Sequence, residues 1–366
     1  MSANPLVVIS TRLAPGQCGI GAHSLLLRKH WPGRDTPFEF VVVEGANGAR
    51  VLREGDRVAE FSGDAASLAR ELDRIGAADL LLHYAGRAYH RFGCPMWLPG
   101  VLKRWKQKFD GARLVVLLHE VPGRMPITSR HFWLGQLNRA VIRRLSSIAD
   151  VLVTNTEAHL KELQDITRRA DIHVLPIGSN IELAAVERQE RARTEFVVFG
   201  LPFGRLQVLR AFDPHVRRWH SSGRLSHLHL IGPAGDRFSQ EAEEVASAWP
   251  ASLSVVRHGM LPGEEVSRLL QRARFALTNV TEETWSKSGS FMACATHRCG
   301  AVIAGARANS MPLACAFSAD EVESVDDDEV ERRTAALATW AVQNVDWSVV
   351  AARMAALLTQ VNANGR

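Results

Sequence analysis

The chain has 366 residues, of which 46% are apolar and 23% charged, so it can bury the cores of two ordinary domains and is not a disordered protein. Its formal charge of +5 is a mild basic bias, compatible with nucleotides, anionic membrane surfaces or nucleic acid, and it selects none of them. No apolar run reaches the roughly 18 residues of a membrane span, and no basic flank precedes the first apolar stretch, so we expect a cytoplasmic protein without a signal peptide.

The first half of the chain repeats one theme. Short β-rich apolar runs are each followed by a glycine-rich or polar loop and an amphipathic stretch. The predicted strands cover residues 5–10, 38–44, 79–84, 113–120, 150–155 and 172–177. Apolar strands that alternate with helices are typical of a parallel sheet covered on both faces, so we predict a doubly wound α/β domain.

The theme restarts after a polar stretch, residues 177–195, that has the composition of a linker. The predicted strands are 196–200, 225–232, 253–259, 274–280 and 301–305, and the predicted helices are 204–220, 239–249, 263–273 and 290–298. The tail, residues 330–361, has helical periodicity that breaks near Asn344 to Trp347. We therefore predict one α/β domain at residues 1–182, a second at 183–345, and a C-terminal helix at 346–366 that packs back on the first.

The loop after the first predicted strand is rich in glycine. In open parallel sheets, ligands bind outside the carboxyl ends of the strands, so residues that directly follow a strand carry the most information. Gly16, Gly19 and Gly21 precede a helix, where glycine permits close backbone approach and the helix N-terminus offers unpaired N–H groups to an anion. The alternative is a flexible connection without a ligand.

Two further segments of the first half are candidate binding regions. His119 and Glu120 end a strand, where a histidine can hydrogen-bond a substrate hydroxyl or can be a satisfied structural residue. Residues 83–98 supply aromatic and basic side chains, which predict either an acceptor pocket or ordinary packing. The candidate acceptor residues are Tyr84, Arg87 and Tyr89.

In the second domain, Gly200, Gly204 and Arg205 follow the first strand, and Arg205 is suited to grip a phosphate through its guanidinium group. A second phosphate site is predicted in the segment TEETWSKSGS, residues 281–290. Serine caps helix starts, a bare helix N-terminus attracts phosphate, and lysine adds a full positive charge. The residues predicted to hold a diphosphate are Lys287, Ser288, Gly289 and Ser290, with Glu282 or Glu283 free to accept from ribose hydroxyls. The alternative is that they only cap a surface helix.

The order and spacing of several motifs resemble the GT-B glycosyltransferases of the large bacterial family four type. The motifs are GQCGIGAHS, LLHE, SIADVLVTNTEAHLKEL, HVLPIGSNI, FGRL, LIGP, HGMLPGEEVSRLLQRARFAL and VDWSVVAARMAALL, and together they span nearly the whole chain. The resemblance implies two Rossmann-like domains that face a cleft, with the acceptor on the N-terminal side and the donor on the C-terminal side.

The resemblance also implies an activity. The protein would be a retaining, metal-independent hexosyltransferase without a cofactor, moving a sugar from a nucleotide-diphosphate donor to a saccharide or lipid-linked acceptor in cell-surface polysaccharide or glycolipid assembly. His119, with Glu120 beside it, would contact the transferred sugar. Gly19, Gly21 and Arg205 would join Lys287 and the serines at the diphosphate. The nucleotide and ribose would contact Gly232, Met260, Glu282 and Glu283.

The sequence departs from this family at one pattern. The family carries two glutamates eight positions apart, and here those positions fall on Lys287 and Ala295 or on Trp285 and Ala293. A catalytically silent GT-B domain that binds sugar or a partner transferase is therefore an alternative. A GT-B epimerase or phosphorylase is a further one, and nucleic-acid binding is not expected because the basic residues form no recognisable motif.

Residues 97–109 combine Trp97, Trp105 and Phe109 with four lysines and arginines, a composition suited to an anionic bilayer surface. An exposed basic helix with partly buried aromatic residues is the alternative. In the first case the protein would lie peripherally at the inner face of the plasma membrane.

No metal site is predicted. The five cysteines are scattered and lack Cys-x-x-Cys spacing, which predicts neither a disulfide framework nor a zinc site. The acidic run at residues 326–331 imitates an Asp-x-Asp metal motif but lies outside any strand end, and we interpret it as a solvated turn that leads into a helix.

Overall fold

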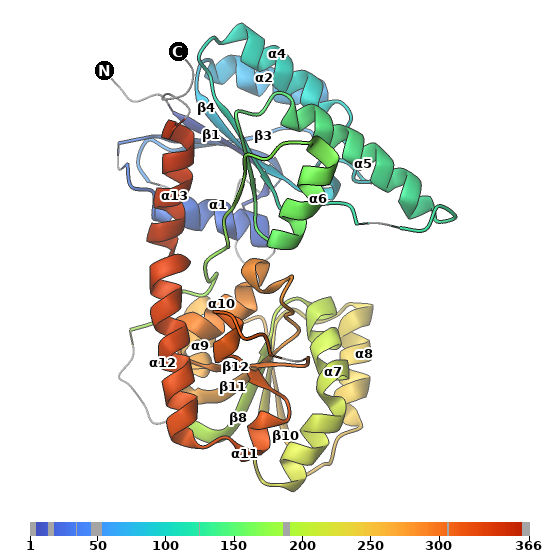
Figure 1. Cartoon of the computed structure of the whole chain (residues 1–366), viewed down its shortest axis with the longest axis vertical. Helices are drawn as coiled ribbons and strands as arrows, with labels where there is room; N and C mark the ends of the chain where they lie inside the picture. The colour runs from blue at the N-terminus through green and yellow to red at the C-terminus, as the bar shows by residue number, and fades with distance from the viewer. Residues whose placement is uncertain are drawn as a thin grey trace. The chain divides into compact units, whose positions relative to one another are not determined.

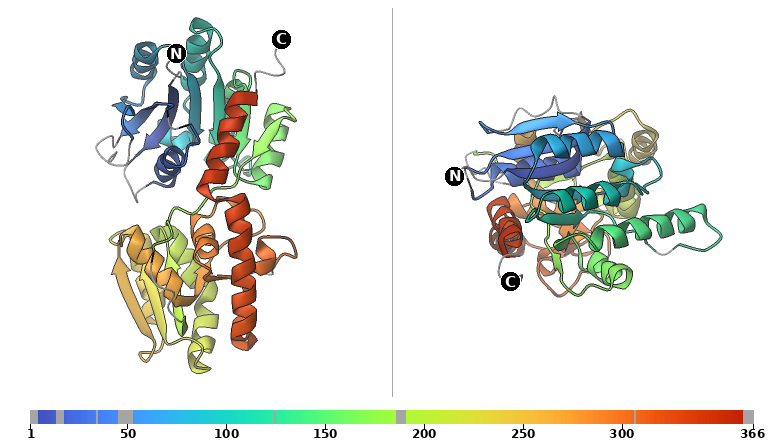
Figure 2. Two further views of the ribbon diagram at one scale, coloured as in Figure 1. Left: turned by 90° about the vertical axis from the view of Figure 1, so that its left-hand side faces the viewer. Right: turned by 90° about the horizontal axis from the view of Figure 1, so that it is seen from above.

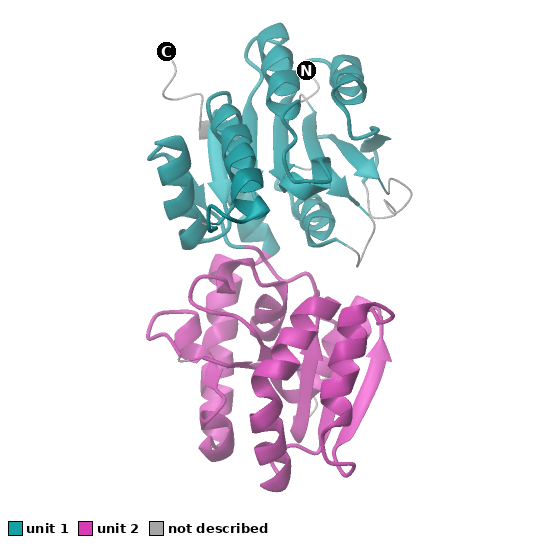
Figure 3. Ribbon diagram, turned by 90° about the vertical axis from the view of Figure 1, so that its right-hand side faces the viewer, with its two compact units in different colours: residues 1–176, 347–366 teal, residues 177–346 magenta. Residues whose placement is uncertain are grey.

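The computed structural model of the chain describes residues 5–13, 18–33, 35–44, 53–123, 125–185, 191–305 and 307–360, the last without its side chain. It divides into two compact units (Figure 3). Unit 1 comprises residues 1–176 and 347–366, and unit 2 comprises residues 177–346. The sequence-based boundaries lie at 182/183 and 345/346. Each unit is built on one parallel sheet, as predicted.

Unit 1 contains a seven-stranded sheet with the order β3-β2-β1-β4-β5-β6-β7, in which every pair is parallel. Its strands are β1 (Leu6–Arg12), β2 (Phe38–Glu44), β3 (Arg57–Glu60), β4 (Asp79–Tyr84), β5 (Leu114–Leu118), β6 (Val151–Thr154) and β7 (Ile172–Val174). Only β3 is absent from the sequence prediction, because its four residues, RVAE, contain no buried side chain.

The alternation of side chains along β1 explains why both faces of this sheet are covered. Val7 and Ile9 point into one core, with helices α2, α4, α5 and α6, whereas Leu6 and Val8 point into a second core with α1 and α13. The helices of unit 1 are α1 (Gly19–Lys29), α2 (Ala65–Ile75), α3 (Gly86–Tyr89), α4 (Leu98–Lys108), α5 (Arg130–Ser146), α6 (Glu157–Thr167) and α13 (Trp347–Gln360).

Unit 2 repeats the topology with a six-stranded parallel sheet in the order β10-β9-β8-β11-β12-β13. Its strands are β8 (Ala192–Phe199), β9 (His227–Ile231), β10 (Ser254–Gly259), β11 (Ala273–Thr278), β12 (Gly300–Ile303) and β13 (Phe317–Ser318). The strand β8 begins inside the stretch predicted as a linker. The prediction misses β13, which has only two residues.

The helices of unit 2 cover the two faces of its sheet. Phe196 and Val198 of β8 pack in a core with α7 and α8, and Val197 packs in another with α9, α10 and α12. The helices are α7 (Pro202–Ser221), α8 (Arg237–Ser247), α9 (Gly263–Arg272), α10 (Gly289–Thr296), α11 (Glu321–Ser324) and α12 (Asp327–Asn344), with short 3-10 turns η2 (Trp285–Lys287) and η3 (Leu313–Cys315).

The C-terminal tail is two helices, and the break between them falls where the sequence predicts it (Figure 1). Asp326 caps α12 by accepting from the backbone N–H of Glu329, so the acidic run forms the first turn of a helix. The second helix, α13, belongs to unit 1, where Val350 and Met354 are fully buried in the core that α1 also lines.

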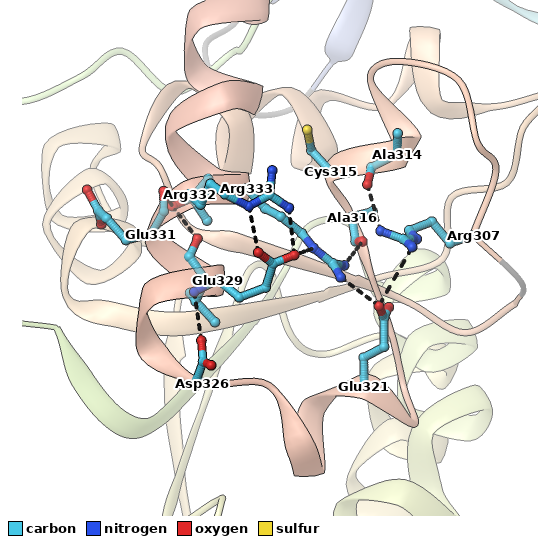
Figure 4. A network of polar contacts seen from close by, with 12 residues as sticks. Arg307, Ala314, Cys315, Ala316, Glu321, Asp326, Glu329, Glu331, Arg332 and Arg333 are labelled. Carbon is cyan, nitrogen blue, oxygen red and sulfur yellow. Dashed lines mark hydrogen bonds and ion pairs between the residues drawn. The ribbon is translucent and has the colours of Figure 1, made fainter.

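A buried arginine ties α12 to the edge of the unit 2 sheet (Figure 4). The Arg333 guanidinium donates to Glu329 at 2.6 Å, to Glu321 at 2.8 Å and to the Ala316 carbonyl at 3.1 Å. It also lies 4.8 Å from the ring centre of Phe317 in β13. This network fixes the first turns of α12 against β13.

The structure corrects the interpretation of residues 97–109 as a membrane face. Trp105 of α4 is buried in the main core of unit 1, and Trp97 and Phe109 pack against that core. Lys106 is bonded to Asp150 and Lys108 to Asp73. The aromatic side of α4 therefore faces the sheet. None of the helices in the described ranges is both long enough and apolar enough to cross a bilayer.

Candidate functional site

Each sheet has one point where the crossovers leave in opposite directions, and its carboxyl edge is the expected place for a ligand. In unit 1 this point lies between β1 and β4, and in unit 2 between β8 and β11.

At the edge of unit 1, three histidine rings lie together. Nδ1 of His83, in the penultimate position of β4, is 2.9 Å from Nε2 of His119, the residue after β5. The ring of His23, from α1, meets both rings edge-on, with centroids 5.2 and 5.6 Å away. The indole ring of Trp347, the first residue of α13, closes the cluster 4.9 Å from His23.

Asn155 fixes the proton positions in this cluster. Its amide nitrogen donates to the Leu175 carbonyl at 2.9 Å, which leaves the amide oxygen to accept from His119, with which its side chain also bonds. His119 then carries its proton on Nδ1 and accepts at Nε2 from His83. Both ring nitrogens of His119 are thus engaged by protein groups.

The histidines are held neutral. Burial lowers the pKa of His23 to about 3 and that of His119 to about 4, and it lowers the pKa of His83 well below its ordinary value. Among the described residues, no group hydrogen-bonds to either ring nitrogen of His23 or to Nε2 of His83. The edge of unit 1 therefore offers uncharged imidazoles rather than cations.

The predicted acceptor residues are placed differently from one another. Tyr84 and Tyr89 are buried in the core, where their hydroxyls donate to Asn138 at 2.9 Å and to the His83 carbonyl at 2.6 Å. This corrects the prediction that they line an acceptor pocket, because neither ring is open to a ligand. Arg87 and Glu120 are exposed at the same edge.

The two described glycines of the first loop have different environments, and Gly16 lies outside the described residues. A Cβ at Gly21 would overlap the carbonyl oxygen of Arg12, so this glycine lets α1 approach β1. Gly19, the first residue of α1, has open space around it. Gly19 is therefore the position at which a ligand can approach the N-terminus of α1.

In unit 2, glycines lie at the carboxyl ends of three neighbouring strands: Gly200 follows β8, Gly232 follows β9, and Gly259 is the last residue of β10. The N–H of Gly200 donates to the Ile231 carbonyl at 3.1 Å, and the N–H of Gly232 donates to that of Gly259 at 2.8 Å. Arg205, in the first turn of α7, lies over Gly232 and donates to the Pro233 carbonyl at 2.5 Å. Arg205 is nearly buried, so in this structure it holds the loop after β9.

The predicted diphosphate residues gather at the N-terminus of α10. The Ser288 hydroxyl accepts from the N–H of Phe291 at 3.2 Å and lies 3.1 Å from that of Ser290. Lys287 is exposed at the end of η2, directly before the cap. Gly289, the first residue of α10, lies against the amide of Asn180, which a Cβ would approach to 3.0 Å.

No carboxylate occupies the positions of the family's paired glutamates. Ala293 and Ala295 are fully buried in α10, and the Trp285 ring packs edge-on against Trp340 at 5.5 Å. Glu282 and Glu283 are exposed in the turn before η2, and Met260 is exposed after β10. Within the described ranges, no three His, Cys, Asp or Glu side chains are placed to hold a metal ion.

His23, Asn155 and Asn180 are not among the residues predicted from the sequence, and His83 enters only as part of the stretch 83–98. Asn155 ends a predicted strand and His83 is next to the end of one, so the rule that finds His119 could have found both. His23 and Asn180 lie elsewhere in the chain, in a helix and in a long loop, and only the folded chain places them at these edges.

The chain matches no protein-family model and no curated protein sequence. Among solved structures, sucrose-phosphate synthase from Thermosynechococcus elongatus is similar, with a TM-score of 0.75 and 10% identity over 99% of this chain and 100% of that one. A glycosyltransferase from Rickettsia africae has a TM-score of 0.69 and 11% identity over 99% and 100%.

A trehalose 6-phosphate synthase from Burkholderia multivorans has a TM-score of 0.65 and 16% identity over 98% and 97% of the two chains. These similarities establish the fold: two Rossmann-like domains in series, as in GT-B glycosyltransferases. At such identities they establish the fold alone.

Proposed function

We propose that the protein is a glycosyltransferase that moves a sugar from a nucleoside-diphosphate donor to an acceptor hydroxyl, with retention of anomeric configuration and without a metal ion. The fold supports sugar transfer in general. The donor, the stereochemistry and the acceptor class are proposals that rest on the residues at the two sheet edges.

The N-terminus of α10 is the observation that carries this proposal. It follows β11 at the switch point of the unit 2 sheet, and it brings Lys287, the Ser288 and Ser290 hydroxyls and the first N–H groups of a helix to one place. Each of these groups favours an anion. A diphosphate is the anion that a parallel sheet of this topology most often receives at such an edge.

The same groups supply the chemistry of the leaving step. When the glycosidic bond to the donor breaks, negative charge grows on the diphosphate oxygen that leaves. Lys287 and the helix N–H groups stabilise that charge electrostatically, and the N–H groups do so from positions fixed by the helix. Exposed Glu282 and Glu283, in the turn before η2, are available to accept from ribose hydroxyls.

Unit 1 would serve the transferred sugar and the acceptor. The neutral His83–His119 pair is bonded within the protein, and the exposed polar groups of this edge are Glu120 and Arg87. Glu120 and Arg87 are therefore the side chains available to hydrogen-bond sugar hydroxyls. The acceptor would be a saccharide or a lipid-linked saccharide of a cell-surface polysaccharide or glycolipid, handled at the cytoplasmic face of the membrane.

The test is nucleotide binding by a Lys287→Ala variant. UDP, GDP, ADP, CMP and common nucleotide sugars are screened by thermal shift, and Lys161→Ala, an exposed lysine of α6, is the matched control. A ligand at about 100 times its dissociation constant stabilises the fold by roughly 2.7 kcal/mol, a shift of a few degrees. The proposal requires that one nucleotide stabilises the parent and the control and that Lys287→Ala loses the shift.

A catalytically silent GT-B domain is the second candidate, and the absence of carboxylates at positions 293 and 295 favours it. Such a domain binds the nucleotide sugar but leaves it intact. Incubation of the stabilising nucleotide sugar with the protein, with and without acceptor saccharides, separates the two. Release of the nucleoside diphosphate supports the transferase, and binding without release supports the silent domain.

A further inference from the structure

Exposed apolar side chains are concentrated around the first turns of α5. Of the twelve large apolar residues exposed in the described part of the chain, six lie on α5, on the loop before it or on the neighbouring loop after α3. They are Phe92, Met96, Met125, Ile127, Trp133 and Leu137. Ile127 is 64%, Trp133 60% and Leu137 48% exposed. Large apolar side chains gathered in this way mark an interaction surface.

These residues lie on or beside an arm of unit 1, which consists of α5 and the loop before it, residues 121–146. Figures 1 and 2 show α5 extending away from the unit 1 sheet, with the loop before it at the outer end. The loop after α3 is fastened to this arm, because the Cys94 thiol lies 3.3 Å from the Leu134 carbonyl. A cavity of about 380 Å³ opens on the arm and is lined by Met125, Phe132 and Arg139, among others.

Arginines flank the exposed apolar residues along one stripe of α5. At 100° per residue, Arg130, Trp133, Leu137 and Arg144 fall within about 60° of one another on the helix. None of the four arginines of α5 has a carboxylate partner among the residues that the structure describes. Long basic side chains beside exposed apolar ones are the arrangement that an interface between water and lipid favours.

Charge is distributed unevenly in the same region. Residues 121–146, which form the loop before α5 and the helix itself, contain five arginines and no acidic residue, although the whole chain has 39 acidic residues and a net charge of only +5. The arm therefore carries charge of a single sign. A partner that covers the arm is expected to be anionic.

We infer that the arm docks on an anionic lipid bilayer. The surface that carries this contact, the α5 face, consists of Met125, Ile127, Arg130, Trp133, Leu137 and Arg144. Leucine, isoleucine and methionine have no aromatic face to stack on a base, so their presence favours lipid over a nucleic acid. The single sign of the charge, next to exposed apolar side chains, favours a sheet of anionic headgroups over a protein.

Membrane docking rests on the proposed function, because a transferase with a lipid-linked acceptor must reach a membrane. It also relocates the membrane contact from α4, whose aromatic side is buried, to α5. Vesicle binding requires no nucleotide sugar. A failure of docking and a failure of sugar transfer are therefore separate results.

The experiment is co-sedimentation of the full chain with vesicles of phosphatidylcholine alone or with about one-third phosphatidylglycerol. The parent binds the anionic vesicles and releases them in high salt, as expected for basic residues at a charged surface. The double variants Trp133→Ala/Leu137→Ala and Arg130→Ala/Arg144→Ala each lower the partition coefficient about tenfold or more.

Two matched controls keep the test specific. Leu183→Ala/Val342→Ala removes two apolar side chains that are equally exposed in unit 2, and Arg237→Ala/Arg268→Ala removes two exposed arginines of unit 2. Both controls retain vesicle binding. Three results overturn the inference: equal binding to neutral and anionic vesicles, equal losses in the controls, or binding to single-stranded DNA without binding to vesicles.

Discussion

Nδ1 of His83 lies 2.9 Å from Nε2 of His119, and the two rings are nearly parallel, with an interplanar angle of 10°. The hydrogen bond between the two rings needs one proton. His83 supplies it, because His119 already donates its own ring proton to Asn155. Protonation of either ring would place a charge in a desolvated cluster that contains a third imidazole, His23. Neutrality is therefore a condition for this arrangement.

The first prediction concerns the pH dependence of stability. The pKa of His23 is about 3 in the folded protein, against 6.5 for an imidazole in water. Between these values the unfolded chain binds more protons, so the free energy of unfolding falls as the pH falls below 6.5. Each proton contributes about 1.4 kcal/mol per pH unit, so His23 alone costs about 2 kcal/mol between pH 6.5 and pH 5.

A His23→Phe variant removes that contribution while it keeps an aromatic ring beside Trp347. Between pH 7.5 and pH 5, we expect the free energy of unfolding of the variant to fall by about 2 kcal/mol less than that of the parent. At pH 7.5 the two proteins should have similar free energies of unfolding. Urea denaturation at both pH values measures this difference, with exposed His131→Phe as the control. Parallel losses in parent and variant would show that His23 is protonated in the folded state.

The second prediction separates the capping and the binding roles of Ser288. Asp is as good an N-cap as Ser, so Ser288→Asp should keep the stability of α10 while it adds a negative charge where the phosphate is proposed. We expect nucleotide affinity to fall at least about tenfold, because like charges repel. Ser288→Ala should have the opposite pattern. It should lose about 1 kcal/mol of stability because the helix cap is removed, and its nucleotide affinity should fall less than that of Ser288→Asp.

Isothermal titration with the stabilising nucleotide and urea denaturation of both variants check the second prediction. If Ser288→Asp binds the nucleotide as the parent does, the N-terminus of α10 does not face the phosphate, and the helix cap is then its whole role.

The third prediction compares two adjacent arginines of α12. Arg333 is nearly buried and joins Glu329, Glu321 and the Ala316 carbonyl, whereas Arg332 is exposed and is bonded to Glu329. Arg333→Met leaves the buried Ala316 carbonyl and two partly exposed carboxylates without their donor, and we expect a loss of about 1–3 kcal/mol. Arg332→Met should cause no measurable loss, because an exposed ion pair is screened by water. Thermal denaturation that ranks the two variants equally would contradict this account.

Much of the fold could be predicted from the sequence because a buried parallel strand has a simple pattern. The runs of β2 and β4 are apolar and bounded by turns, and their limits match the prediction residue for residue. The edge strand β3, RVAE, has no such run, and β13 has two residues. Neither strand can therefore be distinguished in the sequence from the loops around it.

The candidate site could be predicted only where its residues are contiguous. Lys287 to Ser290 form one turn, and capping preferences identify that turn without knowledge of the rest of the fold. The histidine cluster draws His23, His83 and His119 from three elements, and no spacing in the sequence relates them. Whether an aromatic ring faces inward, as Tyr84 and Tyr89 do, depends equally on packing that the sequence does not show.

The last prediction uses the two glycines of α1 to divide fold from binding. Gly21→Ala would press a Cβ against the Arg12 carbonyl, and overpacking of this kind costs about 2 kcal/mol. Gly19→Ala meets no atom within 4 Å, and we expect stability to stay within about 0.5 kcal/mol of the parent. If the N-terminus of α1 contacts the nucleotide sugar, the new methyl group at position 19 obstructs that contact, and the affinity falls several-fold. Urea denaturation and isothermal titration measure the two effects. Unchanged affinity in Gly19→Ala would show that the N-terminus of α1 does not contact the nucleotide sugar.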